Sequence, residues 1–73
     1  MAEALDFTLR GEFIALDALL KASGVASSGG AAKVLIAEGG VRVNGEAETR
    51  RGRKLRAGDV VAMSDGRAIR VSG

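Results

Sequence analysis

The sequence contains no cysteine and no histidine. Without cysteine the chain has no disulfide framework of the kind that stabilises small secreted proteins. A structural zinc site, whose ligands are cysteine and histidine, is excluded as well. The same two absences remove the commonest general base and the strongest nucleophile. The acidic residues suggest no pair that would share a proton. We therefore expect no enzymatic activity, no catalytic residue, no cofactor and no metal site.

The 73-residue chain also lacks proline, tryptophan and tyrosine. No apolar run reaches the roughly 18 residues that a transmembrane helix needs. The first residues, MAEALDFTLRG, are acidic where a secretory signal would be basic, and they include no apolar segment. A chain of this length forms one domain with a small core. We expect a single domain over residues 1–73, located in the cytoplasm and not associated with a membrane.

Charge is unevenly distributed along the chain, although the formal net charge is only +2. Residues 50–56 read RRGRKLR and contain five cations and no acid: Arg50, Arg51, Arg53, Lys54 and Arg56. Four of the nine acids lie within the first seventeen residues: Glu3, Asp6, Glu12 and Asp17. Segregated charge predicts a positive face, which attracts polyanions.

The first half of the chain predicts one strand and two helices. Residues 6–10 alternate between polar and apolar side chains, as in a short half-buried strand. Residues 12–22 carry apolar side chains at helical spacing, with Phe13 on the core face. Gly24 then suits the left-handed position that follows a helix. A second helix over residues 28–38 has Ser27 or Ser28 as its N-cap.

The second half predicts four short strands, at residues 41–43, 46–49, 60–63 and 68–71. Asn44-Gly45 is a strong signal for a hairpin turn, and Asp65-Gly66 predicts a second tight turn. We expect residues 50–56 to form a loop and the strand at 68–71 to be an exposed edge. The fold class is α+β, with two short helices packed on a small, mostly antiparallel sheet. A monomer is expected, and a dimer through the exposed edge stays an alternative.

Three features are candidates for anion binding. The cations of residues 50–56 suit phosphate contacts, because arginine pairs with phosphate oxygens in a bidentate manner; the alternative is a solvated loop. The segment SSGGAAK, residues 27–33, opens a helix with small residues, so backbone amides near Ser28 and Gly29 suit a phosphate and Lys33 adds charge. An ordinary helix cap is the alternative. Arg42 points outward from its strand, as a phosphate contact or a plain surface residue.

Other motifs predict structure and not chemistry. We interpret Asn44-Gly45 and Asp59 as turn residues. Phe7 and Phe13 are the only aromatic residues, and both fall on predicted core faces, so base stacking is not expected. If the partner is RNA, shape and phosphate contacts must dominate the recognition.

The order of these motifs resembles the RNA-binding domain of the ribosomal-protein-S-four type, the alpha-L motif, with a core over about residues 14–63. The similarity begins with Leu16-Asp17 at the first helix and continues with the capping Ser28, and it ends with a Gly-Asp pair before a strand. Between these lie further matching positions: Ala32, Lys33, Ile36, Gly39, Val41, Val43, Asn44, Gly45, Gly58 and Asp59. Residues 48–54, ETRRGRK, further resemble the small stand-alone YbcJ-like branch of bacterial proteins.

The resemblance implies a non-catalytic protein that binds structured RNA, of the rRNA or tRNA class. Many family members have arginine where this chain has Ala15 and Gly29, which implies that the contact surface moves toward Lys33 and residues 50–56. Ribosomal or RNA-modification proteins are further possible partners. The predicted RNA-binding residues are Ser28, Gly29, Lys33, Arg42, Arg50, Arg51, Arg53, Lys54 and Arg56.

Two other functions remain open at this point. The cationic face would also suit an acidic protein partner. The V-N-G-E hairpin and the later Gly-Asp strand are in addition similar to beta-grasp sulfur carriers, which need a Gly-Gly tail. This chain ends Val71-Ser72-Gly73 and predicts a second helix that such a carrier would not have there.

Overall fold

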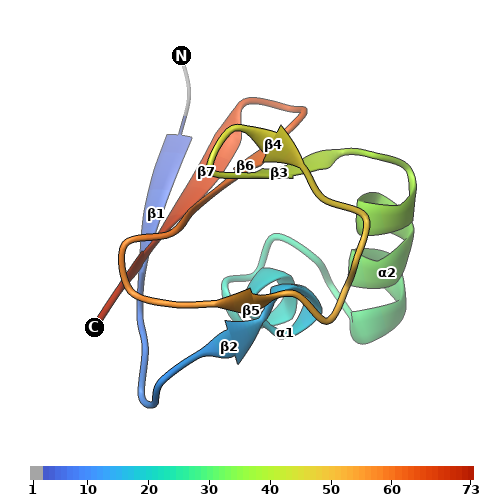
Figure 1. Ribbon diagram of the computed structural model, residues 1–73. Helices are drawn as coiled ribbons and strands as arrows, with labels where there is room; N and C mark the ends of the chain where they lie inside the picture. Colours follow the sequence, from blue (N-terminus) through green and yellow to red (C-terminus); the bar gives the residue numbers. More distant parts are fainter. Residues whose placement is uncertain (1–2) are drawn as a thin grey trace.

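The computed structural model describes residues 3–73, which form two helices and seven strands (Figure 1). The strands are β1 (Glu3–Thr8), β2 (Ile14–Ala15), β3 (Val41–Val43), β4 (Glu46–Ala47), β5 (Lys54–Leu55), β6 (Val60–Met63) and β7 (Arg67–Ser72). The helices are α1 (Leu16–Ala22) and α2 (Gly29–Ala37). Two helices on a mostly antiparallel sheet confirm the predicted α+β class.

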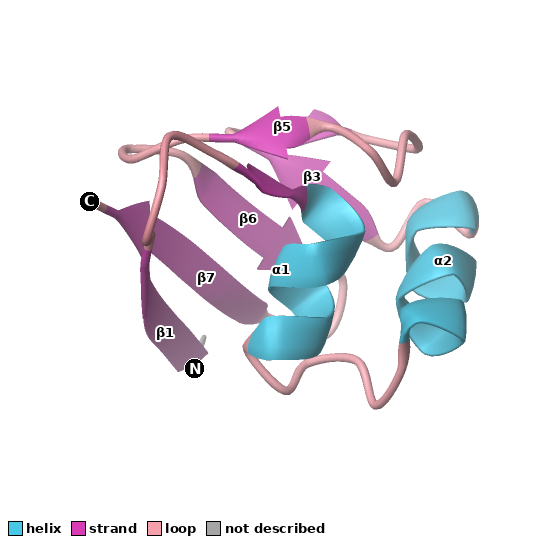
Figure 2. Cartoon of the chain, turned by 90° about the horizontal axis from the view of Figure 1, so that it is seen from below, coloured by secondary structure: helices cyan, strands magenta, loops and turns pink. Residues whose placement is uncertain are grey.

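Five strands form the main sheet, in the order β1-β7-β6-β3-β4. The β1–β7 pair is parallel, and the other pairs in this sheet are antiparallel. A second, two-stranded sheet consists of β2 and β5 (Figure 2). The expectation that the strand at residues 68–71 is an edge was wrong, because β7 lies between β1 and β6. The edges of the main sheet are β1 and β4.

One apolar cluster joins the helices to the sheets. Leucines of α1 and two residues of α2 pack with the inward side chains of β3, β6 and β7, since alternate strand residues face the same side. Leu55 of β5 is fully buried in the same cluster. The fully buried members are Leu16, Leu19, Leu20, Ala32, Ile36, Val41, Val43, Leu55, Val61 and Ile69. The core thus anchors the segment that carries five of the eleven cations.

Several local predictions are confirmed. The second helix has Ser28 as its N-cap, and the Ser28 Oγ accepts a hydrogen bond from the backbone N–H of Ala31 at 3.1 Å. Gly24 has a positive φ of 83°, as expected after α1. Asn44 and Gly45 both have positive φ, 52° and 86°, which is the backbone of a type I′ hairpin turn.

The first helix is shorter than predicted, and residues 50–56 are not entirely a loop. Helix α1 begins at Leu16, because residues 14–15 pair with residues 54–55 as strands. Phe13 therefore precedes a strand and is 46% exposed, so its predicted place on the core face was wrong. The first strand ends at Thr8 and extends back to Glu3, so the predicted range of 6–10 was displaced.

Neither helix is a candidate for a membrane span, as judged over residues 3–73. The same part of the chain contains no cluster of three acidic, histidine or cysteine side chains that would hold a metal ion.

Candidate nucleic-acid interface

The basic segment, residues 50–56, has a backbone that is fixed at several points. The carbonyl of Arg53 accepts a hydrogen bond from the N–H of Leu16 at 2.8 Å, and the carbonyl of Arg51 accepts one from Asp17 at 3.0 Å. These two amides open α1, which has no side-chain cap. The pairing of β5 with β2 and the burial of Leu55 fix the segment further. The cations are thus displayed from an ordered backbone.

Strand alternation decides which of these cations point outward. Leu55 is buried, whereas its neighbours Lys54 and Arg56 are exposed. Because successive strand residues face opposite sides, the Lys54 side chain leaves the outward face of β5, and Arg56 follows directly after the strand. The Nζ of Lys54 lies 4.9 Å from the ring centroid of Phe13, in a cation–π contact.

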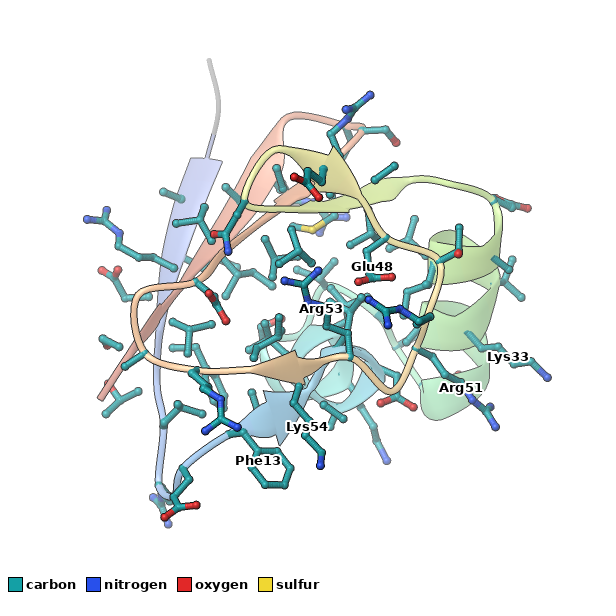
Figure 3. All side chains as sticks on the ribbon, in the orientation of Figure 1. Phe13, Lys33, Glu48, Arg51, Arg53 and Lys54 are labelled. Atoms are coloured by element: carbon teal, nitrogen blue, oxygen red, sulfur yellow. The ribbon has the colours of Figure 1, made fainter. Side chains whose placement is uncertain are left out.

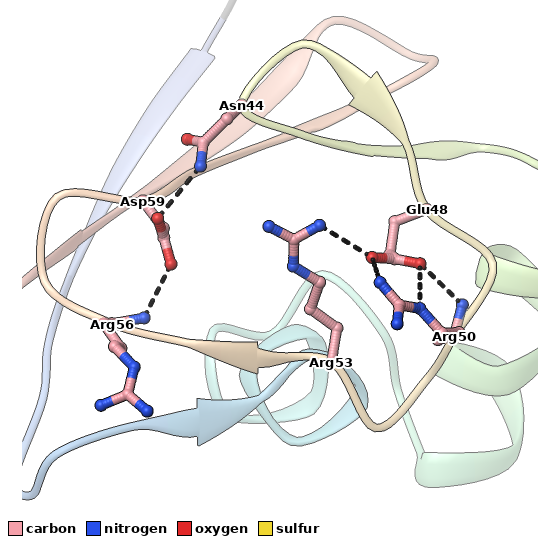
Figure 4. Close-up of polar contacts among 6 residues, drawn as sticks. All are labelled: Asn44, Glu48, Arg50, Arg53, Arg56 and Asp59. Atoms are coloured by element: carbon pink, nitrogen blue, oxygen red, sulfur yellow. Dashed lines mark hydrogen bonds and ion pairs between the residues drawn. The ribbon is translucent and has the colours of Figure 1, made fainter.

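A buried carboxylate lies beneath two of the predicted phosphate contacts (Figure 4). Glu48 is only 5% exposed. Its Oε2 is 3.1 Å from the Nε of Arg50 and its Oε1 is 3.2 Å from the Nη2 of the same residue. The Nη1 of Arg53 donates to Oε1 at 2.9 Å, and the backbone N–H of Arg50 donates to Oε2 at 3.1 Å. Glu48 therefore has four hydrogen bonds from two arginines.

These hydrogen bonds hold Glu48 in its charged form. The side chain of Arg50, then that of Arg53, then the backbone of Arg50 lower the pKa of Glu48 from 4.5 to about 2. Burial acts in the opposite direction and is outweighed. The Glu48 carboxylate in turn raises the pKa of Arg50. At neutral pH one negative charge therefore offsets part of the positive charge of the basic segment.

The two arginines are not equivalent toward solvent. The Arg50 side chain is 76% exposed, whereas that of Arg53 is 31% exposed. Arg50 thus has donors left for a partner, and Arg53 lies partly inside. A hollow of about 450 Å³ is lined by Arg50, Gly52, Arg53 and Lys54. This hollow is the concave, cationic part of the surface.

Hydrogen bonds among polar groups connect the C-terminal end of the basic segment to the β3–β4 turn (Figure 4). The Nδ2 of Asn44 donates to the Oδ1 of Asp59 at 3.0 Å, and the backbone N–H of Val60 donates to the Oδ1 of Asn44 at 2.9 Å. The backbone N–H of Arg56 donates to the Oδ2 of Asp59 at 2.8 Å. The Arg56 backbone and then the Asn44 side chain lower the pKa of Asp59. Asp59 is a turn residue, as predicted, and Asn44 acts through its side chain as well as its φ.

The first turns of α2 carry the other predicted contacts, Ser28, Gly29 and Lys33. Figure 3 shows the Lys33 and Arg51 side chains extending in the same direction beside α2. Both residues are exposed, and neither forms an ion pair within residues 3–73. Gly29, the first residue of α2, is exposed, and a Cβ built on it meets nothing within 4 Å. Ser28, Gly29 and Lys33 are therefore all exposed along the first turns of α2.

Arg42 stands apart from the other predicted contacts. Its neighbours Val41 and Val43 are fully buried against the helices, so Arg42 projects from the opposite face of β3. Across residues 3–73, no hydrogen bond or ion pair joins its side chain to the basic segment. The structure does not bring Arg42 together with the rest of the predicted site.

Two residues of this surface were missed from the sequence. Glu48 directly follows β4 and precedes Arg50 by two positions and Arg53 by five. An acid this close to two arginines indicates an ion pair, which the structure contains. Phe13 was assigned to a helix, although Phe13-Ile14 also fits the outward and inward alternation of a strand.

The structure has two helices, an Asn-Gly hairpin and a basic segment that contacts α1. Comparison with known families points to the same kind of domain. A family model described as "S4 domain" matches residues 7–72. The chain belongs to the S4 domain family, as the motif resemblance predicted.

Individual relatives are small bacterial proteins of similar length. The chain is 52% identical over 52 residues to "Probable ribosome maturation protein RlbA" of Bacillus subtilis (strain 168), covering 71% of this chain and 73% of that protein. It is 45% identical over 53 residues to "Putative RNA-binding protein YbcJ" of Escherichia coli (strain K12), covering 73% of this chain and 74% of that protein. "Uncharacterized protein YbcJ" of Shigella flexneri matches to the same extent.

Proposed function

We propose that this chain is a non-catalytic, single-domain RNA-binding protein that docks on folded RNA through phosphate contacts. The observation that carries the proposal is the basic segment, whose exposed cations lie on a backbone fastened to α1, β2 and the core. Membership of the S4 domain family and the name of the Escherichia coli relative, "Putative RNA-binding protein YbcJ", support RNA as the polyanion.

Most of these cations would contact phosphates directly, whereas one would shape the cationic hollow. Four cations are exposed and form no ion pair within the described chain, so no ion pair must break when a phosphate binds there: Lys33, Arg51, Lys54 and Arg56. Arg50 contributes its remaining donors beside the cationic hollow. Arg53 serves mainly to shape that hollow.

A further phosphate contact is proposed at the start of α2. The amides of the first turn and the helix dipole favour an anion, and the missing side chain at Gly29 leaves the backbone accessible. Lys33, one turn later, adds a positive charge. Arg42 projects from the other face of β3 and takes no part in this binding surface.

The relatives and the chemistry of the surface support a structured RNA of the rRNA or tRNA class as the partner. The Bacillus subtilis relative is named as a probable ribosome maturation protein, which favours rRNA, and tRNA is the alternative structured RNA. Contacts to phosphates read the shape of a folded RNA more than its sequence. We expect the protein to act in the cytoplasm as a monomer.

A salt series tests the proposal with a matched pair of variants. The double variant K33Q/R51Q removes two exposed cations of the proposed surface. The control R67Q/R70Q removes the same charge from β7, where both arginines pair with exposed acids. We expect the slope of log K against log salt for the unmodified protein to be about −3 or steeper, and K33Q/R51Q to reduce its magnitude by about 1.5. The control should keep the original slope.

The opposite results would overturn the proposal. If K33Q/R51Q and the control bind a folded RNA with the same affinity and slope as the unmodified protein, the surface is not a phosphate-binding surface. A flat slope or no binding at low salt would favour an acidic protein partner. Nucleic acid that co-purifies is readily detected by absorbance at 260 nm, because the chain has no tryptophan or tyrosine.

A further inference from the structure

Phe13 is a large aromatic side chain that the fold leaves outside its core. The residue is 46% exposed. The partly buried residues that pack on the core include its neighbour Ile14 but not Phe13 itself. The pairing of Ile14 with Leu55 explains this, because Ile14 faces inward and the residue before it must face outward. Phe13 therefore contributes little to the core, and close to half of the residue is exposed to a partner although the Lys54 ammonium lies near its ring.

The surface next to Phe13 is apolar and hollow. Phe7, Leu9 and Ile14 line a hollow of about 560 Å³ together with Phe13, and Arg10 lies at the same hollow. Asp6 also lines it, but its carboxylate lies 3.4 Å from the Nε of Arg70. A volume of this size is within the range of small-ligand sites and admits a flat heterocycle.

Lys54 connects this hollow to the cationic one. Its side chain lines the 450 Å³ hollow of the basic segment, and its Nζ lies 4.9 Å from the centroid of the Phe13 ring (Figure 3). The proposed phosphate site and the aromatic surface of Phe13 are therefore neighbours, with Lys54 in contact with both. A nucleotide has the same two parts, an anionic phosphate and a planar base, joined by one sugar.

We propose that Phe13 is a stacking platform for an unpaired base of the bound RNA, and that Lys54 contacts the phosphate next to that base. This inference rests on the proposed RNA-binding function and deepens it. Stacking needs an exposed π-face and tolerates any base, so the site would select an unpaired nucleotide and not a sequence. Bases inside a duplex are stacked on each other and cannot reach the ring. The protein would therefore prefer RNA with a bulge or loop beside its helical part.

The test uses two hairpin RNAs that differ only in one bulged base, and a non-nucleotide linker closes each stem so that no loop bases are present. We expect the unmodified protein to bind the bulged hairpin more tightly. Phe13→Ala should weaken that binding roughly tenfold and leave binding to the fully paired hairpin unchanged. Phe13→Leu keeps an apolar side chain but has no ring, so it should behave like Phe13→Ala. Val34→Ala truncates another exposed apolar residue, on α2, and should change neither affinity.

Phe13→Trp supplies a direct readout, because the chain has no other tryptophan. This variant should keep the preference for the bulged hairpin, and the bound base should quench its tryptophan emission. Quenching that the fully paired hairpin produces equally would contradict base stacking.

The outcomes separate the two proposals. If Phe13→Ala and Phe13→Leu bind both hairpins as the unmodified protein does, the stacking site is wrong, while the effect of K33Q/R51Q would still support phosphate binding. If the unmodified protein binds neither hairpin at low salt, both proposals fail. The melting temperature of each variant is compared with that of the unmodified protein, and Phe13→Leu decides the result if Phe13→Ala unfolds.

Discussion

The guanidinium of Arg53 donates a hydrogen bond of 2.9 Å to the buried carboxylate of Glu48, within the most basic part of the chain. The same carboxylate also holds Arg50 through two side-chain hydrogen bonds. A negative charge at this position weakens the field that attracts a polyanion. Its geometric effect is the opposite, because it fixes two flexible side chains beside the cationic hollow.

The first prediction separates these two effects of Glu48. Glu48→Gln removes the negative charge and replaces one acceptor oxygen with an NH2 group, so the four hydrogen bonds from Arg50 and Arg53 cannot all form and these side chains are held less firmly. We expect the affinity for a folded RNA to fall severalfold, although charge alone would raise it. The measurement is the dissociation constant at one fixed salt concentration.

Glu46→Gln is the matched control for that experiment. Glu46 lies in β4 two residues before Glu48 and is exposed, so its removal changes the net charge equally without freeing an arginine. It should leave RNA affinity unchanged or slightly raise it. Tighter binding by both variants would show that Glu48 acts only through its charge.

The second prediction concerns the turn residue Asn44, which has a φ of 52° and hydrogen bonds to Asp59 and Val60. Asn44→Gly keeps the backbone conformation but loses the hydrogen bonds, at a cost of about 1–2 kcal/mol in the free energy of unfolding. Asn44→Ala loses the same bonds and adds the strain of a left-handed residue, about 1 kcal/mol more. Urea denaturation measures both. Equal stability of the two variants would show that strain at residue 44 is negligible.

The parts of the fold that local sequence signals determine could be predicted, and the parts that non-local strand pairing determines could not. Helix α2, the Asn44-Gly45 turn and β3 follow from local signals, namely a serine cap, a glycine stop and two valines around Arg42. The edge position of β7 was wrong because the parallel pairing with β1 joins the two ends of the chain. No local pattern encodes such a non-local contact.

The candidate site was predictable in its charges but not in their pairing. The concentration of cations in residues 50–56 is visible in the sequence, whereas the burial of Glu48 depends on how the segment crosses the core. Phe13 fits both a helical period with Leu16 and a strand alternation with Ile14. Pairing of Ile14 with Leu55, forty-one positions away, decides between them.

The third prediction tests the proposed phosphate contact at the start of α2. Gly29→Ala should stabilise the protein by about 0.5–1 kcal/mol, because alanine favours the helix and a Cβ there meets nothing within 4 Å. If a phosphate approaches this backbone, the same methyl group weakens RNA binding. We therefore expect higher stability with lower affinity, measured by urea denaturation and by RNA titration.

Gly30→Ala is the neighbouring control, since its Cβ would meet only the Ser28 Oγ at 3.8 Å. This substitution should also stabilise the helix, and it should reduce affinity less than Gly29→Ala does. RNA affinity that stays unchanged in Gly29→Ala would remove the start of α2 from the binding surface.

The fourth prediction is a loss of stability at acid pH caused by Glu48. Its pKa is lowered to about 2 in the folded protein from an ordinary 4.5, first by the Arg50 side chain and then by Arg53. Between these values the unfolded chain binds a proton that the folded protein does not, so stability falls as the pH falls. The contribution of Glu48 is fully present above about pH 5 and is lost progressively toward about pH 2. The pKa of Asp59 and that of Asp65 are also lowered, which adds to the same trend.

Urea denaturation followed by far-ultraviolet circular dichroism, repeated across this pH window, measures the effect. Glu48→Gln should be less stable than the unmodified protein at neutral pH, by about 1–3 kcal/mol. Its stability should depend less steeply on pH within the window, because the largest shifted group is gone. Asp65→Asn is the control: Asp65 is an exposed acid whose partner is Arg67, and its removal should leave most of the steep dependence in place. Parallel curves for Glu48→Gln and the unmodified protein would show that the Glu48 ion pairs do not stabilise the fold.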